Sequence, residues 1–193
     1  MVNNPESDAT ERVSEPITPH NYRAVRFAML VFITTQIVPF FTLFSAKYLY
    51  DWFYVSPQAN QGFGIAVSVL MAISAIVAWQ AVVASRVHQD RDLVGSRLKT
   101  AMVIGLLAVI GEIYQWGMRY VSPGSRFGEM YYMIFGADYV YVLAGIVMLA
   151  IAIIRNIRQN MAPERFWTAD ATVYFWIFVC LAWIASWFWV YIL

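Results

Sequence analysis

Two acidic residues, Glu112 and Asp138, lie inside long apolar stretches of this sequence. An acid at the centre of a membrane-spanning helix costs at least ~2.5 kcal/mol, so it needs a polar partner or a function. A carboxyl group in apolar surroundings can hold a proton, bind an ion or contact a lipid head group. These two residues are therefore the first candidates for chemistry in this chain.

Three other polar residues are expected to lie near these acids. Gln115 follows Glu112, and Tyr141 follows Asp138, by three residues, which places each pair on one helix face. At ~1.5 Å of rise per residue, Glu112 would lie ~9 Å and Asp138 ~12 Å from one boundary of a ~30 Å membrane core. Gln36, in the first apolar stretch, has a comparable depth by the same arithmetic. The sequence thus predicts one intramembrane polar layer in the outer half of the bundle.

Two interpretations of this layer stay open. It could be a buried hydrogen-bonded network that fixes helix packing, with each acid protonated or bonded to a neighbouring helix. It could instead be a site for a proton, an ion or a lipid head group. Small residues on the same helix faces, such as Gly105 and Gly145, would let neighbouring helices approach closely. The layer is therefore expected to face protein rather than lipid.

The sequence offers few ligands for a metal or a cofactor. Its two histidines, His20 and His88, lie outside the apolar stretches, and Cys180 is the single cysteine. Histidine is the usual axial ligand of haem and a major ligand of copper. We therefore predict no catalytic, cofactor-binding or metal-binding residue in this chain.

The composition requires that membrane helices position these residues. Of the 193 residues, 61% are hydrophobic and 13% are charged, whereas a soluble domain is about half apolar and about a quarter charged. A spanning helix needs about 20 apolar residues. We predict an all-α integral membrane bundle of five transmembrane helices, at about residues 25–48, 64–85, 98–120, 130–154 and 171–193.

The charges and the ends of the chain predict its organisation. Residues 1–21 are expected to form a disordered cytosolic tail, and residues 22–193 the membrane domain. Ten of the 13 lysines and arginines fall in the tail and in the second and fourth loops, which places the N-terminus inside and the C-terminus outside.

A net charge of +1 without a basic run argues against nucleic-acid binding. The last helix carries four residues expected to form an outer aromatic belt: Trp183, Trp187, Trp189 and Tyr191.

The spacing of several motifs resembles subunit III of the haem-copper oxidases. In the first helix, the run over residues 32–50 is similar to that family's first common helix, with Gln36 where the family has a buried glutamate. In the third helix, Gly105 matches a family glycine, which puts Glu112 at the family's glutamine position and Gln115 at its glutamate position. The two polar residue types are thus exchanged.

The fourth helix carries the most recognisable match. The family has Thr-Gly-x-His-x-x-His-Val-x-x-Gly, and this chain has Phe135-Gly136-Ala137-Asp138-Tyr139-Val140-Tyr141-Val142-Leu143-Ala144-Gly145. Both glycines and the valine are kept, whereas Asp138 and Tyr141 replace the two histidines. The start of the last helix also resembles the family, through Phe166-Trp167, Asp170 and Trp176.

The resemblance implies a non-catalytic subunit of a respiratory terminal oxidase in a bacterial inner membrane. Such a subunit packs against a catalytic subunit I-like protein and further membrane subunits, and it binds phospholipids. Haem and copper are expected in the catalytic partner and not in this chain. The implied role is to stabilise that partner and to support proton uptake and oxygen access while the complex reduces oxygen with electrons from cytochrome c or quinol.

Two other functions stay open at the level of sequence. The chain could be a small transporter or an assembly factor, with Glu112 and Asp138 as the proton or ion groups of a carboxyl-lined site. It could also be the accessory subunit of a nitric oxide reductase complex. Both alternatives keep the same five-helix fold.

Overall fold

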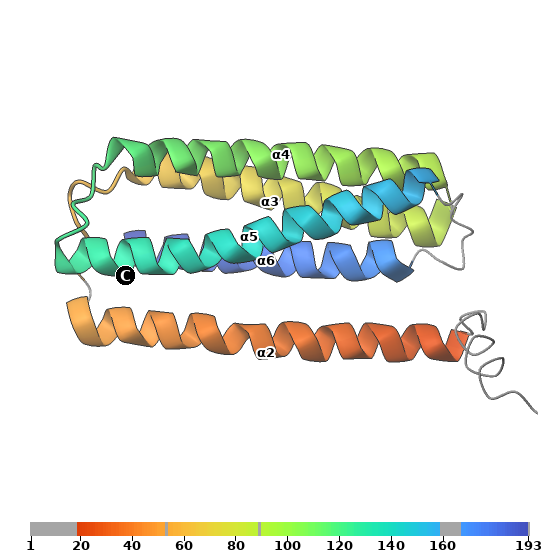
Figure 1. Ribbon diagram of the computed structural model, residues 1–193, viewed down its shortest axis with the longest axis horizontal. Coiled ribbons are helices and arrows are strands. Elements are labelled where there is room, and N and C mark those ends of the chain that lie inside the picture. The colour runs from red at the N-terminus through yellow and green to blue at the C-terminus, as the bar shows by residue number, and fades with distance from the viewer. Residues whose placement is uncertain (1–18, 53, 89, 159–166, 193) are drawn as a thin grey trace, which may run out of the picture.

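Long helices make up the computed structural model, which describes residues 19–52, 54–88, 90–158 and 167–192. Five of them run the length of the molecule side by side (Figure 1). They are α2 (Pro19–Asp51), α3 (Gln61–Val83), α4 (Arg91–Met118), α5 (Arg126–Arg158) and α6 (Trp167–Tyr191), and a short π-helical turn, η1 (Ala84–His88), extends α3. Each of the five is long and apolar enough to cross a membrane, so the predicted all-α fold of five spans is confirmed.

The helix ends differ from the ends of the predicted spans because local signals outside the apolar core set them. α4 begins at Arg91, since the Asp90 carboxylate caps it by accepting from the backbone N–H groups of Asp92 and Leu93 at 2.9 and 3.1 Å. α2 begins at Pro19, where proline fits the first helical turn because it lacks the N–H group that would stay unpaired there. The predicted tail otherwise lies outside the described residues. The orientation, N-terminus inside and C-terminus outside, stays a prediction.

Four of the helices form the body of the bundle, and α2 lies along one side of it (Figure 1). α3 packs against α4 and α6, α5 packs against α4 and α6, and α2 contacts mainly α6 and α5. In the most apolar stretch of α2, only 6% of the residues are buried inside the chain, against 33–44% in the corresponding stretches of the other four helices. The apolar side chains of α2 therefore face mostly outward, towards lipid or another chain.

Trp176, on α6, lies at the centre of the four-helix part and is fully buried. Two helices approach its ring through glycines, Gly105 on α4 and Gly145 on α5. Its indole Nε1 donates to the Ser74 hydroxyl of α3 at 2.9 Å, and that hydroxyl donates to the Ala101 carbonyl of α4 at 2.7 Å. One side chain thus links four helices, and its hydrogen bond removes the cost of a buried indole N–H.

Candidate functional site

Glu112 lies in a hydrogen-bonded cluster built by α4, α5 and α6. Its carboxyl is 2% exposed and accepts from the Tyr131 hydroxyl at 3.2 Å. The Tyr131 hydroxyl lies 3.2 Å from that of Tyr191, which also accepts from Gln115 Nε2 at 3.0 Å. Glu112 and Gln115, one helical turn apart, are thus joined through two tyrosines of neighbouring helices.

Asp138, on α5, is 1% exposed and, like Glu112, lies in the interior of the bundle. The Ser186 side chain of α6 lies beside it. Its Oδ2 has no hydrogen-bond partner among the residues that the structure describes. A buried polar atom without a partner is costly, so Asp138 is a candidate for a contact that the described residues do not supply.

Gln36 and Tyr141 form a separate pair that joins α2 to α5. The Tyr141 hydroxyl donates to Gln36 Oε1 at 3.1 Å, and the Tyr141 ring lies 4.9 Å from the Phe40 ring. This pair is a polar link between α2 and the rest of the bundle. The structure therefore brings Glu112 and Gln115 into one cluster and Gln36 and Tyr141 into one pair, and a single layer containing all five predicted residues stays a prediction.

Sequence reasoning missed Tyr131 and misplaced Tyr191. Tyr191 and Trp183 were expected in an outer aromatic belt, but both are buried, at 2% and 1% exposure, so this part of the belt prediction is wrong. The Tyr191 ring turns inward because its hydroxyl finds polar partners inside the bundle, and the Trp183 ring packs against Phe135 and Tyr139. A signal for Tyr131 was present: it precedes Asp138 by two helical turns, which places both on one face of α5.

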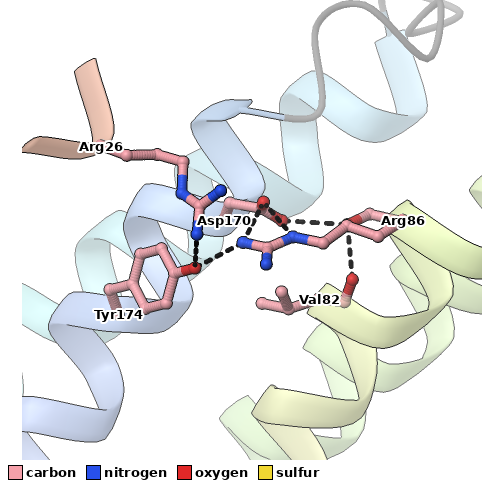
Figure 2. A network of polar contacts seen from close by, with 6 residues as sticks. Arg26, Val82, Arg86, Asp170 and Tyr174 are labelled. Atoms are coloured by element: carbon pink, nitrogen blue, oxygen red, sulfur yellow. Dashed lines mark hydrogen bonds and ion pairs between the residues drawn. The ribbon is translucent and has the colours of Figure 1, made fainter. Parts of the chain in front are cut away.

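A second polar cluster lies at the opposite end of the bundle, around the buried carboxylate of Asp170 (Figure 2). Asp170 Oδ2 accepts from Arg86 Nε and Nη2 at 3.1 and 3.0 Å, and Oδ1 accepts from the Ser85 hydroxyl at 2.9 Å. The Tyr174 hydroxyl accepts from Arg86 and from Arg26, which joins α2 to the cluster. Two nitrogens of one guanidinium donate to one carboxylate oxygen, which favours a structural clamp between η1, the extension of α3, and α6.

Neither cluster resembles a metal centre. Within the described part of the chain, no group of three histidine, cysteine or acidic side chains could hold a metal ion. His88 is exposed at the end of η1. Cys180, on α6, is buried in the apolar core that several helices form. Histidine, the usual axial ligand of haem and a major ligand of copper, does not occur in either cluster as described above. What the arrangement can do is hold a proton on a buried carboxyl and fix the packing of helices.

The fold and these clusters define a class: a five-helix membrane protein with a buried pair of carboxyl groups. Comparisons with curated proteins find relatives of cytochrome c oxidase subunit 3. The protein of that name from Corynebacterium diphtheriae is 21% identical over 98% of this chain and 97% of its own length. Those from Salmo salar and Oncorhynchus mykiss are 24% and 22% identical over 86% of this chain and 69% of theirs. No protein-family model matches the chain. The relatives support the resemblance and a subunit III-like role.

Glu112→Leu should weaken the bundle or its association with a partner by ~1–3 kcal/mol, because the Tyr131 hydroxyl then loses its buried acceptor. Glu112→Gln is the matched control, since an amide oxygen can still accept from Tyr131. Thermal unfolding of both variants in detergent measures the difference. If Glu112→Leu assembles normally but loses proton-coupled turnover, the cluster is a proton site rather than a packing network.

Proposed function

We propose that this chain is a non-catalytic, subunit III-like component of a respiratory terminal oxidase in a bacterial inner membrane. The observation that carries the proposal is the similarity to the Corynebacterium diphtheriae subunit, which spans nearly the whole of both chains. The alignment thus covers nearly all of the membrane bundle. The chain would pack against a catalytic subunit I-like protein and further membrane subunits.

The role proposed within that complex is to stabilise the catalytic subunit, to bind phospholipids and to support proton and oxygen access. Haem and copper belong to the partner in this proposal, because the predicted spans of this chain contain no histidine. Two features support the stabilising role. The outward-facing α2 offers apolar surface for contact, and the Asp170 clamp and the Trp176 contacts give the remaining helices a fixed arrangement.

Copurification tests the proposal directly. A tagged chain extracted in mild detergent should bring down a stoichiometric haem-containing membrane partner with oxygen-reducing activity. The chain separated from that partner should show no haem or copper absorbance. Recovery of a haem-free monomer from the native membrane, or haem bound to the separated chain, would contradict the proposal.

A second candidate function rests on the buried acids. Glu112 and Asp138 are both buried in the apolar interior, and one oxygen of Asp138 has no partner among the described residues. Such a pair could carry a proton or an ion in a small transporter or serve an assembly factor. Substrate flux or proton flux through liposomes containing the chain alone would favour this function.

A partner that reduces nitric oxide instead of oxygen would assign the chain to a nitric oxide reductase complex.

A further inference from the structure

Tyrosine and tryptophan rings follow one another across the bundle beside Glu112. The Trp116 ring of α4 lies 5.2 Å from the Tyr132 ring of α5, which lies 5.2 Å from the Tyr131 ring. The Tyr131 ring lies 6.1 Å from the Tyr191 ring of α6, which lies 6.4 Å from the Trp187 ring. Such centroid distances are those of aromatic rings in contact. These five side chains therefore form one continuous aromatic path.

The two ends of the aromatic path reach the surface, whereas its middle does not. Trp116, Tyr132 and Trp187 are half-buried, and Tyr131 and Tyr191 are each 2% exposed. Tryptophan and tyrosine lose a single electron more readily than other aromatic side chains, and electrons pass readily between rings in contact. An electron that an oxidant removes from a ring at the surface can therefore be replaced from the buried rings.

A tyrosine that loses an electron must also lose its hydroxyl proton, and Tyr131 has an acceptor for that proton. Its hydroxyl donates to Glu112 Oε1 at 3.2 Å, within the ~2.6–3.2 Å over which a base takes a proton. Because Tyr131 has one hydroxyl hydrogen, the Tyr191 hydroxyl donates to Tyr131 while it accepts from Gln115. The proton of Tyr131 thus faces a carboxyl group, whereas that of Tyr191 faces another hydroxyl.

The other members of the aromatic path have no comparable proton acceptor within the described residues. Trp116 Nε1 and Trp187 Nε1 are buried there without a hydrogen-bond partner, so an oxidised indole cannot pass its proton to a neighbouring side chain. The Tyr132 hydroxyl donates to the Val121 carbonyl at 3.0 Å, and a neutral backbone carbonyl does not hold a proton. Loss of an electron is therefore completed by loss of a proton at Tyr131.

The surroundings of the two ends indicate which oxidant reaches them. α4, α5 and α6 are each long and apolar enough to span a membrane. Within three residues of the half-buried rings, large apolar side chains are exposed: Ile113, Met133 and Phe188. An oxidant that meets this surface must dissolve in the membrane. A peroxyl radical, which forms when oxygen adds to a carbon radical, is a one-electron oxidant of this kind.

We propose that the aromatic path and Glu112 form a radical-quenching site, in which Tyr131 gives one electron to a peroxyl radical in the membrane and its hydroxyl proton to Glu112. The electron leaves through the rings of the path. The peroxyl radical takes this electron and one proton from water and becomes a hydroperoxide. Tyr131 becomes a neutral tyrosyl radical, and the Glu112 carboxylate becomes a carboxylic acid, so that atoms and charges balance.

This activity goes beyond the proposed function and does not depend on it. It requires only the five-helix fold in a membrane or micelle, because every residue involved belongs to this chain. Its failure would leave the association with an oxidase untouched, and a chain without a haem-containing partner could still quench radicals.

Peroxyl radicals generated around the purified full chain test the proposal. A lipid-soluble azo initiator supplies them in detergent micelles under oxygen, samples are frozen at intervals, and EPR spectroscopy measures the tyrosyl radical. We expect a tyrosyl signal that accumulates in the unmodified chain and is mostly lost in Tyr131→Phe. Tyr114→Phe is the matched control, because Tyr114 is 57% exposed on α4, and it should leave the signal unchanged.

Glu112→Gln tests the transfer of the proton and keeps the fold, since an amide oxygen still accepts from Tyr131 but does not take its proton. It should slow the formation of the tyrosyl radical about a hundredfold, the low end of what a positioned proton acceptor contributes. A tryptophan radical should accumulate in its place. Glu129→Gln, the same change at an exposed acid of α5, is the control and should have no effect.

Thermal unfolding of each variant in detergent shows whether the bundle is intact. A Tyr131→Phe chain that keeps the full tyrosyl signal would overturn the assignment, and so would a Tyr114→Phe chain that loses as much of it. If Tyr131→Phe does not fold, Glu112→Gln decides alone. A tyrosyl radical that forms as fast in Glu112→Gln as in the unmodified chain would show that Glu112 does not receive the proton.

Discussion

Gly145→Val should destabilise the four-helix part of the bundle by about 2–3 kcal/mol, because the site has no room for a side chain. A Cβ atom at Gly145 would lie 2.6 Å from Cε3 and 2.9 Å from Cζ3 of Trp176. The indole cannot move away, since a Cβ atom at Gly105 would lie 2.8 Å from Cη2 of the same ring. Its hydrogen bond to Ser74 fixes it further. Inside a membrane, close packing of this kind is a main source of helix association.

Thermal unfolding in detergent, followed by tryptophan fluorescence and by helix content, measures this effect. Gly117→Val is the matched control, because no heavy atom lies within 4 Å of a Cβ atom built there. Trp176→Leu should be destabilising alone, yet it should offset part of the cost of Gly145→Val, since the smaller side chain makes room. Additive effects of the two substitutions would show that Gly145 and Trp176 do not act through their contact.

The five spans could be predicted from sequence because the membrane imposes a length and a composition on each of them. Their ends could not, since a helix continues past the apolar core until local groups end it. Asp90 extends α4 by capping it, and Arg119 closes the same helix in a left-handed conformation with φ of 48°. Neither signal depends on hydrophobicity, so the hydrophobic pattern alone does not give the ends of α4.

The candidate site could be predicted only within single helices. The spacing of Glu112 and Gln115 places both on one face of α4, and the structure joins them in one cluster. Their partners Tyr131 and Tyr191 come from other helices, and a contact between helices depends on rotation and crossing angle, which no local pattern encodes. For the same reason Tyr191 was assigned to the membrane surface although its hydroxyl lies inside the bundle.

The clamp of Arg86 and Asp170 shows the same limit more strongly. In sequence Arg86 is one of several loop cations that indicate orientation, and Asp170 is part of a motif before the last helix. The two residues are 84 positions apart, yet their side chains are 3.0 Å apart in the structure. A stabilising role for either one could not be inferred before α3 and α6 were placed side by side.

Asp170→Ala should therefore destabilise the bundle by about 3 kcal/mol, at the low end of the loss when one member of a buried ion pair is removed. The low end applies because the Arg86 side chain is 35% exposed and can partly reach water, whereas Asp170 is 1% exposed. Ser85 contributes little to this loss, since its hydroxyl can still donate to the Val82 carbonyl at 2.8 Å. The cost comes from the cation that Asp170 leaves without its carboxylate.

The double variant Asp170→Ala/Arg86→Leu separates this explanation from a simple loss of packing. If the uncompensated guanidinium causes the loss, removing it as well should restore most of the stability, because replacing both members of a buried ion pair by apolar groups is often nearly neutral. Glu129→Ala, an exposed acid in the first turn of α5, is the control and should change the free energy of unfolding by no more than ~0.5 kcal/mol. Denaturant unfolding in detergent compares the four proteins. A double variant as unstable as Asp170→Ala would mean that the carboxylate acts through packing or through Ser85, and that the clamp between α3 and α6 is not electrostatic.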